Sequence, residues 1–520
     1  MRSKFNKVAL YLGAMALAFT SCEKSLNINE NPNTPTSATP ELVLPTTIVA
    51  TGNSVPAQSS YGSQIIGYYA NGGGVSGWGS IISYNFTTSS FTGLWSTAYN
   101  ILNDLEYVIK STPETQEHLK YAAMILKAYH FEQLVNTYND VPYTEALLGA
   151  ENLTPSYDKA EDIYKSIGGL LDESIAYFKV ASNASYFTAA DKMMKGDVKR
   201  WAQLANTLKL RLQLKAGNKV AFDKTALDNV GFLTDDAIVN PGYARVDGKL
   251  NPTYSTWAYN AAGTAVGSAS QYAPTYYILA FFDGGKIADE TRAKLFYKTG
   301  LSIPKNQLGY QQSDAGRGQP PSSWYLGTSA TVYDGKGILK GPAAGQPLLL
   351  ASESYFLQAE AVVRGLITGD AKALFENGIK ASYTYLNKNE SDAATTTAAN
   401  ADTYLTAYKA ENNTVRLVNF DLATTNEQKI EAIITQKYIA ANMMFGHESW
   451  NEYRRTGYPA NTGVPSAATR TTNFVSTASE ATTADKLPTR ILYPSTEYNY
   501  NPNNIPADID KYKSKIFWAK

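Results

Sequence analysis

Aromatic side chains in segments rich in glycine and serine are the residues best suited to bind a ligand. Trp78, Trp257 and Trp324 lie in such segments, each near further aromatic residues. A flat ring can cover the apolar C–H face of a sugar, while amide and guanidinium groups bind its hydroxyls. Aromatic loops would also suit a peptide. The candidate ligand-binding residues are therefore the three tryptophans together with Tyr69, Asn71, Tyr254, Asn260, Arg317 and Tyr325.

The sequence offers no convincing set of catalytic or metal-binding groups. Glycoside hydrolysis needs two carboxylates at a fixed separation, but Glu448 and Glu452 are more simply explained as an ion-paired or solvated helix face. His118, His130 and His447 have no spacing that would place two of them on one metal. We therefore predict a protein that is not an enzyme, with no catalytic residue, no metal site and no cofactor. An oxygen-ligated calcium in the Asp- and Asn-rich loops stays open.

Composition narrows the class of protein further. The 520 residues include 46 Lys and Arg against 46 Asp and Glu, a formal net charge of +0. Because a chain without a basic surplus cannot neutralise many phosphates, we expect no nucleic-acid partner. Hydrophobic residues make up 44% of the chain, which is enough for a large core and excludes intrinsic disorder.

The beginning of the chain has the pattern of an exported, lipid-anchored protein. Residues 1–21 combine basic residues with an apolar run too short to span a bilayer, which is typical of a signal peptide. The sequence FTSC that ends at Cys22, the single cysteine, resembles the lipobox of bacterial lipoproteins, so Cys22 is the expected lipidation site. We predict a lipidated tether over residues 22–45 and a single domain over residues 46–520.

Apolar residues recur at spacings of three and four, which predicts amphipathic helices. Asp197 is the predicted N-cap of one helix, and Thr424 with Glu427 has the spacing of a capping box. Helices paired through short turns favour a mostly α-helical scaffold of tetratricopeptide-like hairpins. The stripes run through residues 119–129, 163–178, 201–212, 354–365, 371–386 and 430–441.

Long stretches between these helices are predicted to be irregular and to carry the binding face. They are residues 50–92, 231–275, 300–346 and 456–505. Trp95, Trp201 and Trp450 instead fall within helical stripes and are predicted to lie in the core. Charged residues on or beside the stripes must find partners, so we expect buried ion pairs that involve Arg211, Glu360, Arg364, Arg454, Arg455 and Arg490.

Motifs spread over nearly the whole chain resemble one protein family. They include NINENPN at residues 27–33, YNDVPY at 138–143, PSYD at 155–158, QKYIA at 436–440, ESWNEYRRTGYP at 448–459 and PTRI at 488–491. In their order and spacing the chain is similar to the SusD and RagB family of nutrient-binding outer-membrane lipoproteins, in its SusD-like branch. Asn139 stands where the family more often carries glycine, a change that asparagine's tolerance of the left-handed conformation makes small.

The resemblance implies a mostly helical, tetratricopeptide-like scaffold with long irregular loops. It also implies a lipoprotein of the outer membrane that faces the cell surface, covers a TonB-dependent SusC-like barrel and touches the membrane through its lipid alone. Such a protein would bind a nutrient, most simply an oligosaccharide, and deliver it for import. Two alternatives stay open: a surface glycoside hydrolase or lyase, and a structural transporter subunit that binds peptides or no ligand.

Overall fold

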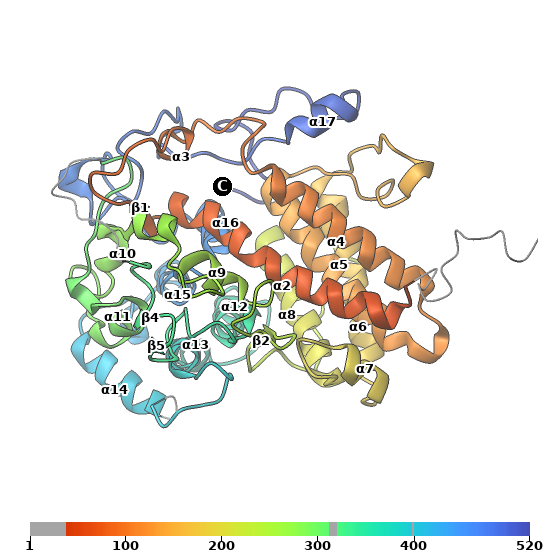
Figure 1. Ribbon diagram of the computed structural model, residues 1–520, viewed down its shortest axis with the longest axis horizontal. Helices are drawn as coiled ribbons and strands as arrows, with labels where there is room; N and C mark the ends of the chain where they lie inside the picture. The colour runs from red at the N-terminus through yellow and green to blue at the C-terminus, as the bar shows by residue number, and fades with distance from the viewer. Residues whose placement is uncertain (1–37, 311–319, 398–399) are drawn as a thin grey trace, which may run out of the picture.

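The computed structural model describes residues 38–310, 320–397 and 400–520, and most of its regular structure is α-helical (Figure 1). The expected signal peptide, Cys22, Arg317 and most of the expected tether lie outside these residues. The mostly helical fold class is confirmed. No helix in the described part of the chain has both the length and the apolar character needed to cross a bilayer.

The first half of the chain forms a layer of long helices in which each packs on the next. Contacts join α2 to α4, α4 to α5, α5 to α6 and α6 to α8. This order of contacts is what helical hairpins produce. The helices are α2 (Pro40–Ile65), α4 (Thr92–Ser111), α5 (Glu117–Tyr138), α6 (Ala160–Phe178) and α8 (Val198–Ala216).

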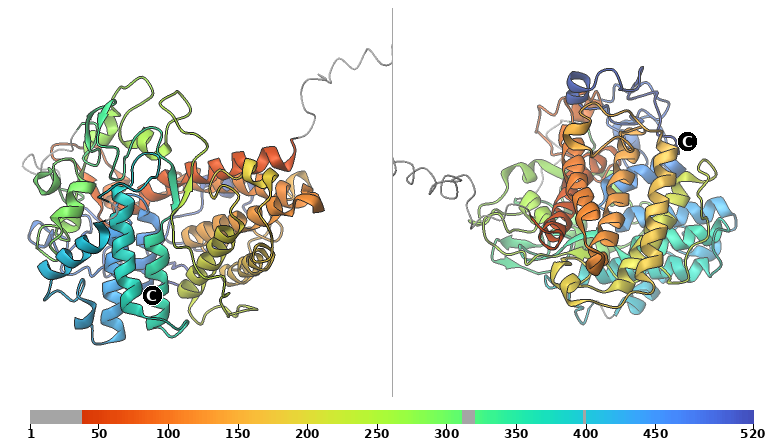
Figure 2. Two further views of the ribbon diagram at one scale, coloured as in Figure 1. Left: turned by 90° about the horizontal axis from the view of Figure 1, so that it is seen from below. Right: turned by 90° about the vertical axis from the view of Figure 1, so that its right-hand side faces the viewer.

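The second half adds another group of helices around the hairpin of α12 and α13. α12 packs on α13, α15 and α8, and α16 packs on α2. Figure 2 shows α2 running along both groups, so one core joins the two halves. These helices are α12 (Ala351–Val363), α13 (Ala371–Asn387), α14 (Ala401–Glu411), α15 (Asn426–Ala440) and α16 (Gly446–Thr456).

Short elements occupy the connecting segments. The short helices are α3 (Ser80–Ser83), α7 (Ser185–Ala190), α9 (Pro252–Trp257), α10 (Tyr276–Leu279), α11 (Glu290–Phe296) and α17 (Ser495–Tyr500). The strands form three antiparallel pairs: β1 (Tyr69–Asn71) with β3 (Tyr272–Pro274), β2 (Ala237–Val239) with β6 (Gln346–Leu349), and β4 (Gly327–Ser329) with β5 (Val332–Tyr333). The three segments after residue 230 predicted to be irregular contain only such short elements.

Helix α2 is the main departure from the sequence-based prediction. Residues 40–45, expected to end the tether, and residues 50–65, the first part of the segment expected to be irregular, belong to this helix. Pro40 suits the first turn, where its missing N–H costs nothing, but Pro45 and Pro56 lie inside the helix and mask it in the sequence. Leu44, Ile48 and other residues around α2 are fully buried, so it shows no single apolar stripe.

Helix starts follow local chemistry closely. The Asp197 side chain accepts a hydrogen bond from the Arg200 N–H at 3.1 Å, which confirms the predicted cap of α8. The capping box of α15 is made by Thr425 and Gln428, one residue beyond the predicted pair, because the helix begins at Asn426. Asn139 ends α5 with a φ of 68°, the positive angle expected for it.

Candidate functional site

Pairing of β1 with β3 brings two distant loops together and assembles an aromatic cluster. The register places Asn71 opposite Tyr272, and the loop that follows β1 carries Trp78 back onto the Tyr272 ring. The two ring centroids lie 4.7 Å apart at 71°, an edge-to-face contact that favours both rings. Trp78 and Tyr272 are both half-buried, so together they present an aromatic edge to solvent.

Three further rings support this edge from behind. Trp257 contacts Tyr272 at 5.4 Å between centroids, and Tyr69 contacts Trp257 at 5.3 Å. Trp324 closes the group at 5.4 Å from Trp257. Tyr69, Trp257 and Trp324 are 1%, 7% and 0% exposed. The aromatic cluster, defined as Tyr69, Trp78, Trp257, Tyr272 and Trp324, therefore has two rings at the surface and three that hold them.

Tyr254 and Tyr325 belong to a second group of rings beside the cluster. Their ring centroids lie 5.9 Å apart, and Tyr325 also contacts Tyr259 at 5.3 Å. Tyr254 and Tyr325 are buried, and burial raises the pKa of both phenols. Both stay neutral at physiological pH. Ligand contact by Trp257, Trp324, Tyr254 and Tyr325 stays a prediction, and all four side chains are buried in this arrangement.

The predicted polar partners have different environments. Asn71 is fully buried, and its amide holds the neighbouring loop: Nδ2 donates to the Tyr310 carbonyl at 3.0 Å and Oδ1 accepts from the Gly309 N–H at 3.1 Å. Asn260 is exposed and accepts a hydrogen bond from the Thr264 N–H at 2.8 Å within its own turn. Arg317 lies outside the described residues. A ligand role for all three stays a prediction.

Tyr272 is the residue of this cluster that sequence reasoning did not select. It lies in a segment predicted to be irregular, among glycine, serine and alanine, fifteen positions after Trp257. The segment around Tyr272 is rich in small residues, like the segments around the tyrosines that were selected. Its position at the surface follows from the β1–β3 pairing, which joins residues far apart in the sequence and has no local signature.

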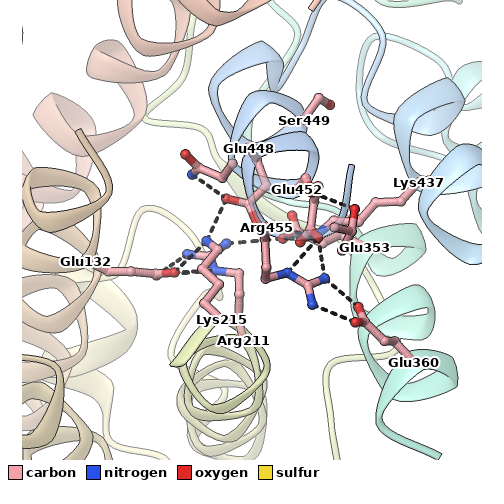
Figure 3. Close-up of polar contacts among 12 residues, drawn as sticks. Glu132, Arg211, Lys215, Glu353, Glu360, Lys437, Glu448, Ser449, Glu452 and Arg455 are labelled. Carbon is pink, nitrogen blue, oxygen red and sulfur yellow. Dashed lines mark hydrogen bonds and ion pairs between the residues drawn. The ribbon is translucent and has the colours of Figure 1, made fainter. Parts of the chain in front are cut away.

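Core tryptophans and buried ion pairs behave largely as predicted. Trp95, Trp201 and Trp450 are 7%, 0% and 0% exposed, which confirms their place in the core. A network of buried charged side chains joins α5, α8, α12, α15 and α16 (Figure 3). Its members are Glu132, Arg211, Lys215, Glu353, Glu360, Lys437, Glu448, Glu452 and Arg455. Arg364 also pairs with Glu360, but its side chain is 37% exposed, so the prediction of burial is wrong for this residue.

The geometry of this ion network explains how it tolerates burial. Lys215 bridges Glu132 and Glu448 with Nζ–O distances of 2.9 and 2.8 Å. Arg455 holds Glu360 through two bonds of 2.6 and 2.7 Å. Burial alone would raise the pKa of Glu360, but the adjacent guanidinium of Arg455 overcomes this and lowers the pKa to about 2. Glu448 and Glu452 are thus ion-paired and buried, and the solvated alternative for them is wrong.

Within the part of the chain that the structure describes, Arg454 and Arg490 do not form the expected ion pairs. Arg454 donates to the carbonyls of Asn136 at 2.8 Å and Thr489 at 3.0 Å, and Arg490 donates to the carbonyl of Tyr138. Two of these carbonyls belong to the last turn of α5, where unpaired acceptors and the negative end of the helix dipole attract cations. The two arginines therefore cap a helix instead of pairing with carboxylates.

The histidines are placed as structural groups. Burial lowers the pKa of His130 to about 3 and that of His447 to about 4, so both are neutral at physiological pH. His130 shares a hydrogen bond of 2.9 Å with the Thr51 hydroxyl. Across the described residues, no group of three or more His, Cys, Asp and Glu side chains is arranged to hold a metal ion.

Comparisons with known proteins agree with this architecture. Among solved structures, a chitin-binding SusD homologue from Flavobacterium johnsoniae has a TM-score of 0.67 at 21% identity, covering 91% of this chain and 98% of its own. A SusD homologue from Bacteroides uniformis has a TM-score of 0.65 at 24% identity, covering 92% and 99%. Identities this low establish the fold alone. No curated protein matches the sequence.

The family is established by sequence as well. A model of a SusD-like family, described as "Starch-binding associating with outer membrane", matches residues 32–494. The mostly helical fold with irregular connecting segments agrees with this class of protein. The chain belongs to this SusD-like family of carbohydrate-binding proteins associated with the outer membrane.

Proposed function

We propose that this protein captures an oligosaccharide at the outer surface of the cell and delivers it, uncleaved, to a TonB-dependent SusC-like barrel. The observation that carries the proposal is the aromatic edge of Trp78 and Tyr272, held in place by three buried rings. A ring pair of this kind covers the C–H face of a sugar without chemistry on its bonds. The family description supports a carbohydrate ligand and an outer-membrane location.

Anchoring through a lipid on Cys22 completes the proposal. Residues 22–39 would connect the lipid to α2, which begins at Pro40. A tether of this kind would fix the protein to the membrane without fixing its orientation, as a cover over a barrel requires. Mass spectrometry of the protein extracted from outer membranes would show acyl chains on Cys22, and a Cys22→Ala variant would lose them and leave the membrane fraction.

Calorimetry across a glycan panel tests the ligand. Starch-type and chitin-type oligosaccharides should be titrated into the purified protein and into a Trp78→Ala variant. If a sugar gains on an aromatic ring the roughly 1–3 kcal/mol that a base gains by stacking, the variant should bind the active glycan about 5- to 150-fold more weakly. Tyr500→Ala is the matched control, since Tyr500 is 76% exposed and lies outside the cluster.

Two results would contradict the proposal. Unchanged affinity in Trp78→Ala would remove the aromatic cluster as the binding site. Release of new reducing ends from any glycan of the panel would instead favour the hydrolase or lyase alternative.

A further inference from the structure

A cavity of about 260 Å³ lies between α4, the loop of residues 142–155 and α17. Its volume is slightly below the range of about 300–1,000 Å³ that is usual for ligand pockets, so its ligand must be small. None of the five residues of the aromatic cluster lines it, so this is a separate site.

Much of the wall of this cavity is apolar. Trp95, Tyr99, Leu147, Leu153 and Tyr500 are among the lining residues. The ring centroids of Trp95 and Tyr99 lie 4.9 Å apart, and both rings pack in or against the core. Leu153 and Tyr500 are instead 77% and 76% exposed. Large apolar side chains that lie this exposed around one cavity favour a site of interaction.

Glu497 is the one charged residue that lines the cavity in the described part of the chain. Glu497 is half-buried, and its Oε2 accepts a hydrogen bond from the Tyr157 hydroxyl at 2.7 Å. No described residue donates to its Oε1, and no described cation pairs with this carboxylate. The cavity therefore offers a negatively charged acceptor that lacks a cation.

The surroundings of the cavity do not neutralise this charge. Burial and then the Glu497 carboxylate raise the pKa of Tyr99 well above its ordinary value, and the same two causes raise the pKa of Tyr157. Glu145 lies nearby, since it accepts a hydrogen bond from the Asn152 amide at 3.3 Å, and it too forms no ion pair with a described residue. The potential in the cavity is therefore negative.

We propose that this cavity binds the ammonium group of a small primary amine that carries an aryl or alkyl body. The ammonium would donate to Oε1 of Glu497, and aromatic rings also attract cations. Two lining amides already have partners, which disfavours a sugar: Asn501 Nδ2 donates to the Pro155 carbonyl at 2.8 Å, and Asn152 Oδ1 accepts from the Thr154 N–H at 3.2 Å. This inference does not depend on the proposed capture of a glycan, because starch-type and chitin-type oligosaccharides carry no ammonium group.

Phenethylamine and its neutral counterpart phenethyl alcohol are the probes that test the site. Calorimetry and ligand-detected NMR on the whole protein at neutral pH should show the amine binding about tenfold more tightly than the alcohol, because charge-assisted hydrogen bonds are roughly twice as strong as neutral ones. In Glu497→Gln the two probes should bind within about twofold of each other. This variant keeps a side-chain oxygen that can accept from the Tyr157 hydroxyl, so we expect α17 to stay in place.

Glu151→Gln is the matched control. Glu151 is exposed and lies in the loop of residues 142–155, but it does not line the cavity. Its variant should therefore keep the preference for the amine.

Three results would overturn the proposal. Equal binding of the two probes to the unaltered protein, or no binding of the amine, would exclude an ammonium site, and this comparison requires no variant to fold. A loss of preference in Glu151→Gln as large as that in Glu497→Gln would assign the preference to the general charge of the surface. Glucose binding more tightly than phenethylamine would assign the cavity to a sugar.

Discussion

Glu360 illustrates how a buried charge is stabilised by its partners. Its carboxylate accepts from Arg455 on α16 and from Arg364, so Glu360→Gln would leave a buried guanidinium with one partner fewer. Since breaking a buried pair costs about 3–5 kcal/mol, we expect the free energy of unfolding to fall by about 3 kcal/mol in urea denaturation. The exposed pair of Lys294 and Glu290 provides the control: Lys294→Gln should change it by no more than about 0.5 kcal/mol. An equal effect of both variants would refute this account.

The buried histidines predict how stability depends on pH. His447 and His130 have folded pKa values of about 4 and 3, below the ordinary value of about 6.5. Between pH 6.5 and 4 the unfolded chain therefore binds more protons than the folded one. Stability is fully present above pH 6.5 and falls with decreasing pH by up to about 1.4 kcal/mol per unit for each histidine.

NMR of the imidazole protons checks this prediction directly. In the folded protein the signals of His130 and His447 should not shift between pH 7.5 and 5.5. In urea the same signals should titrate near pH 6.5. A folded-state midpoint near 6.5 for either ring would contradict the argument from burial.

Two glycines, Gly62 on α2 and Gly446 at the start of α16, determine how closely these helices approach. A Cβ on Gly62 would lie 2.3 Å from the backbone nitrogen of His447 and 2.4 Å from the Gly446 carbonyl carbon. Gly62→Ala should therefore force the helices apart and lower the free energy of unfolding by about 3 kcal/mol. Gly169, inside α6, has nothing within 4 Å of the same position, so Gly169→Ala should raise stability by about 1 kcal/mol. Thermal unfolding should show a lower melting temperature for Gly62→Ala and a higher one for Gly169→Ala.

Periodicity predicted α6, which buries one apolar stripe, but also α5, α8 and α15, which are buried on most sides. The predicted stripes left out α2, α4 and α14, although α4 buries a single face. α2 is buried against several neighbours and contains two prolines, so its sequence shows neither a stripe nor helix propensity. The predicted helix caps were accurate to about one residue, as the capping box at Thr425 shows.

Selection of the candidate binding residues from the sequence was limited by long-range structure. Glycine-rich loops with aromatic residues could be recognised from composition. Whether a ring points to solvent depends on pairing between β1 and β3 and on the layers beneath, which is why Trp324 is fully buried and Tyr272 is not.

At the scale of the whole molecule, the proposed binding edge rests on the common core. Tyr69, Trp257 and Trp324 belong to the core that joins the two groups of helices, and Trp78 and Tyr272 pack against it from the surface. The two surface rings lie in segments that connect the long helices, which is where scaffolds usually carry binding residues.

The measurement that tests the central claim most directly is a ¹⁵N–¹H spectrum of the tryptophan indoles during titration with the glycan that calorimetry identifies. The account predicts that the Trp78 signal shifts and saturates with the ligand, that the Trp201 signal in the core stays fixed, and that the glycan is recovered intact. A Trp78 signal that does not move while the glycan binds, or a glycan recovered as fragments, would contradict it.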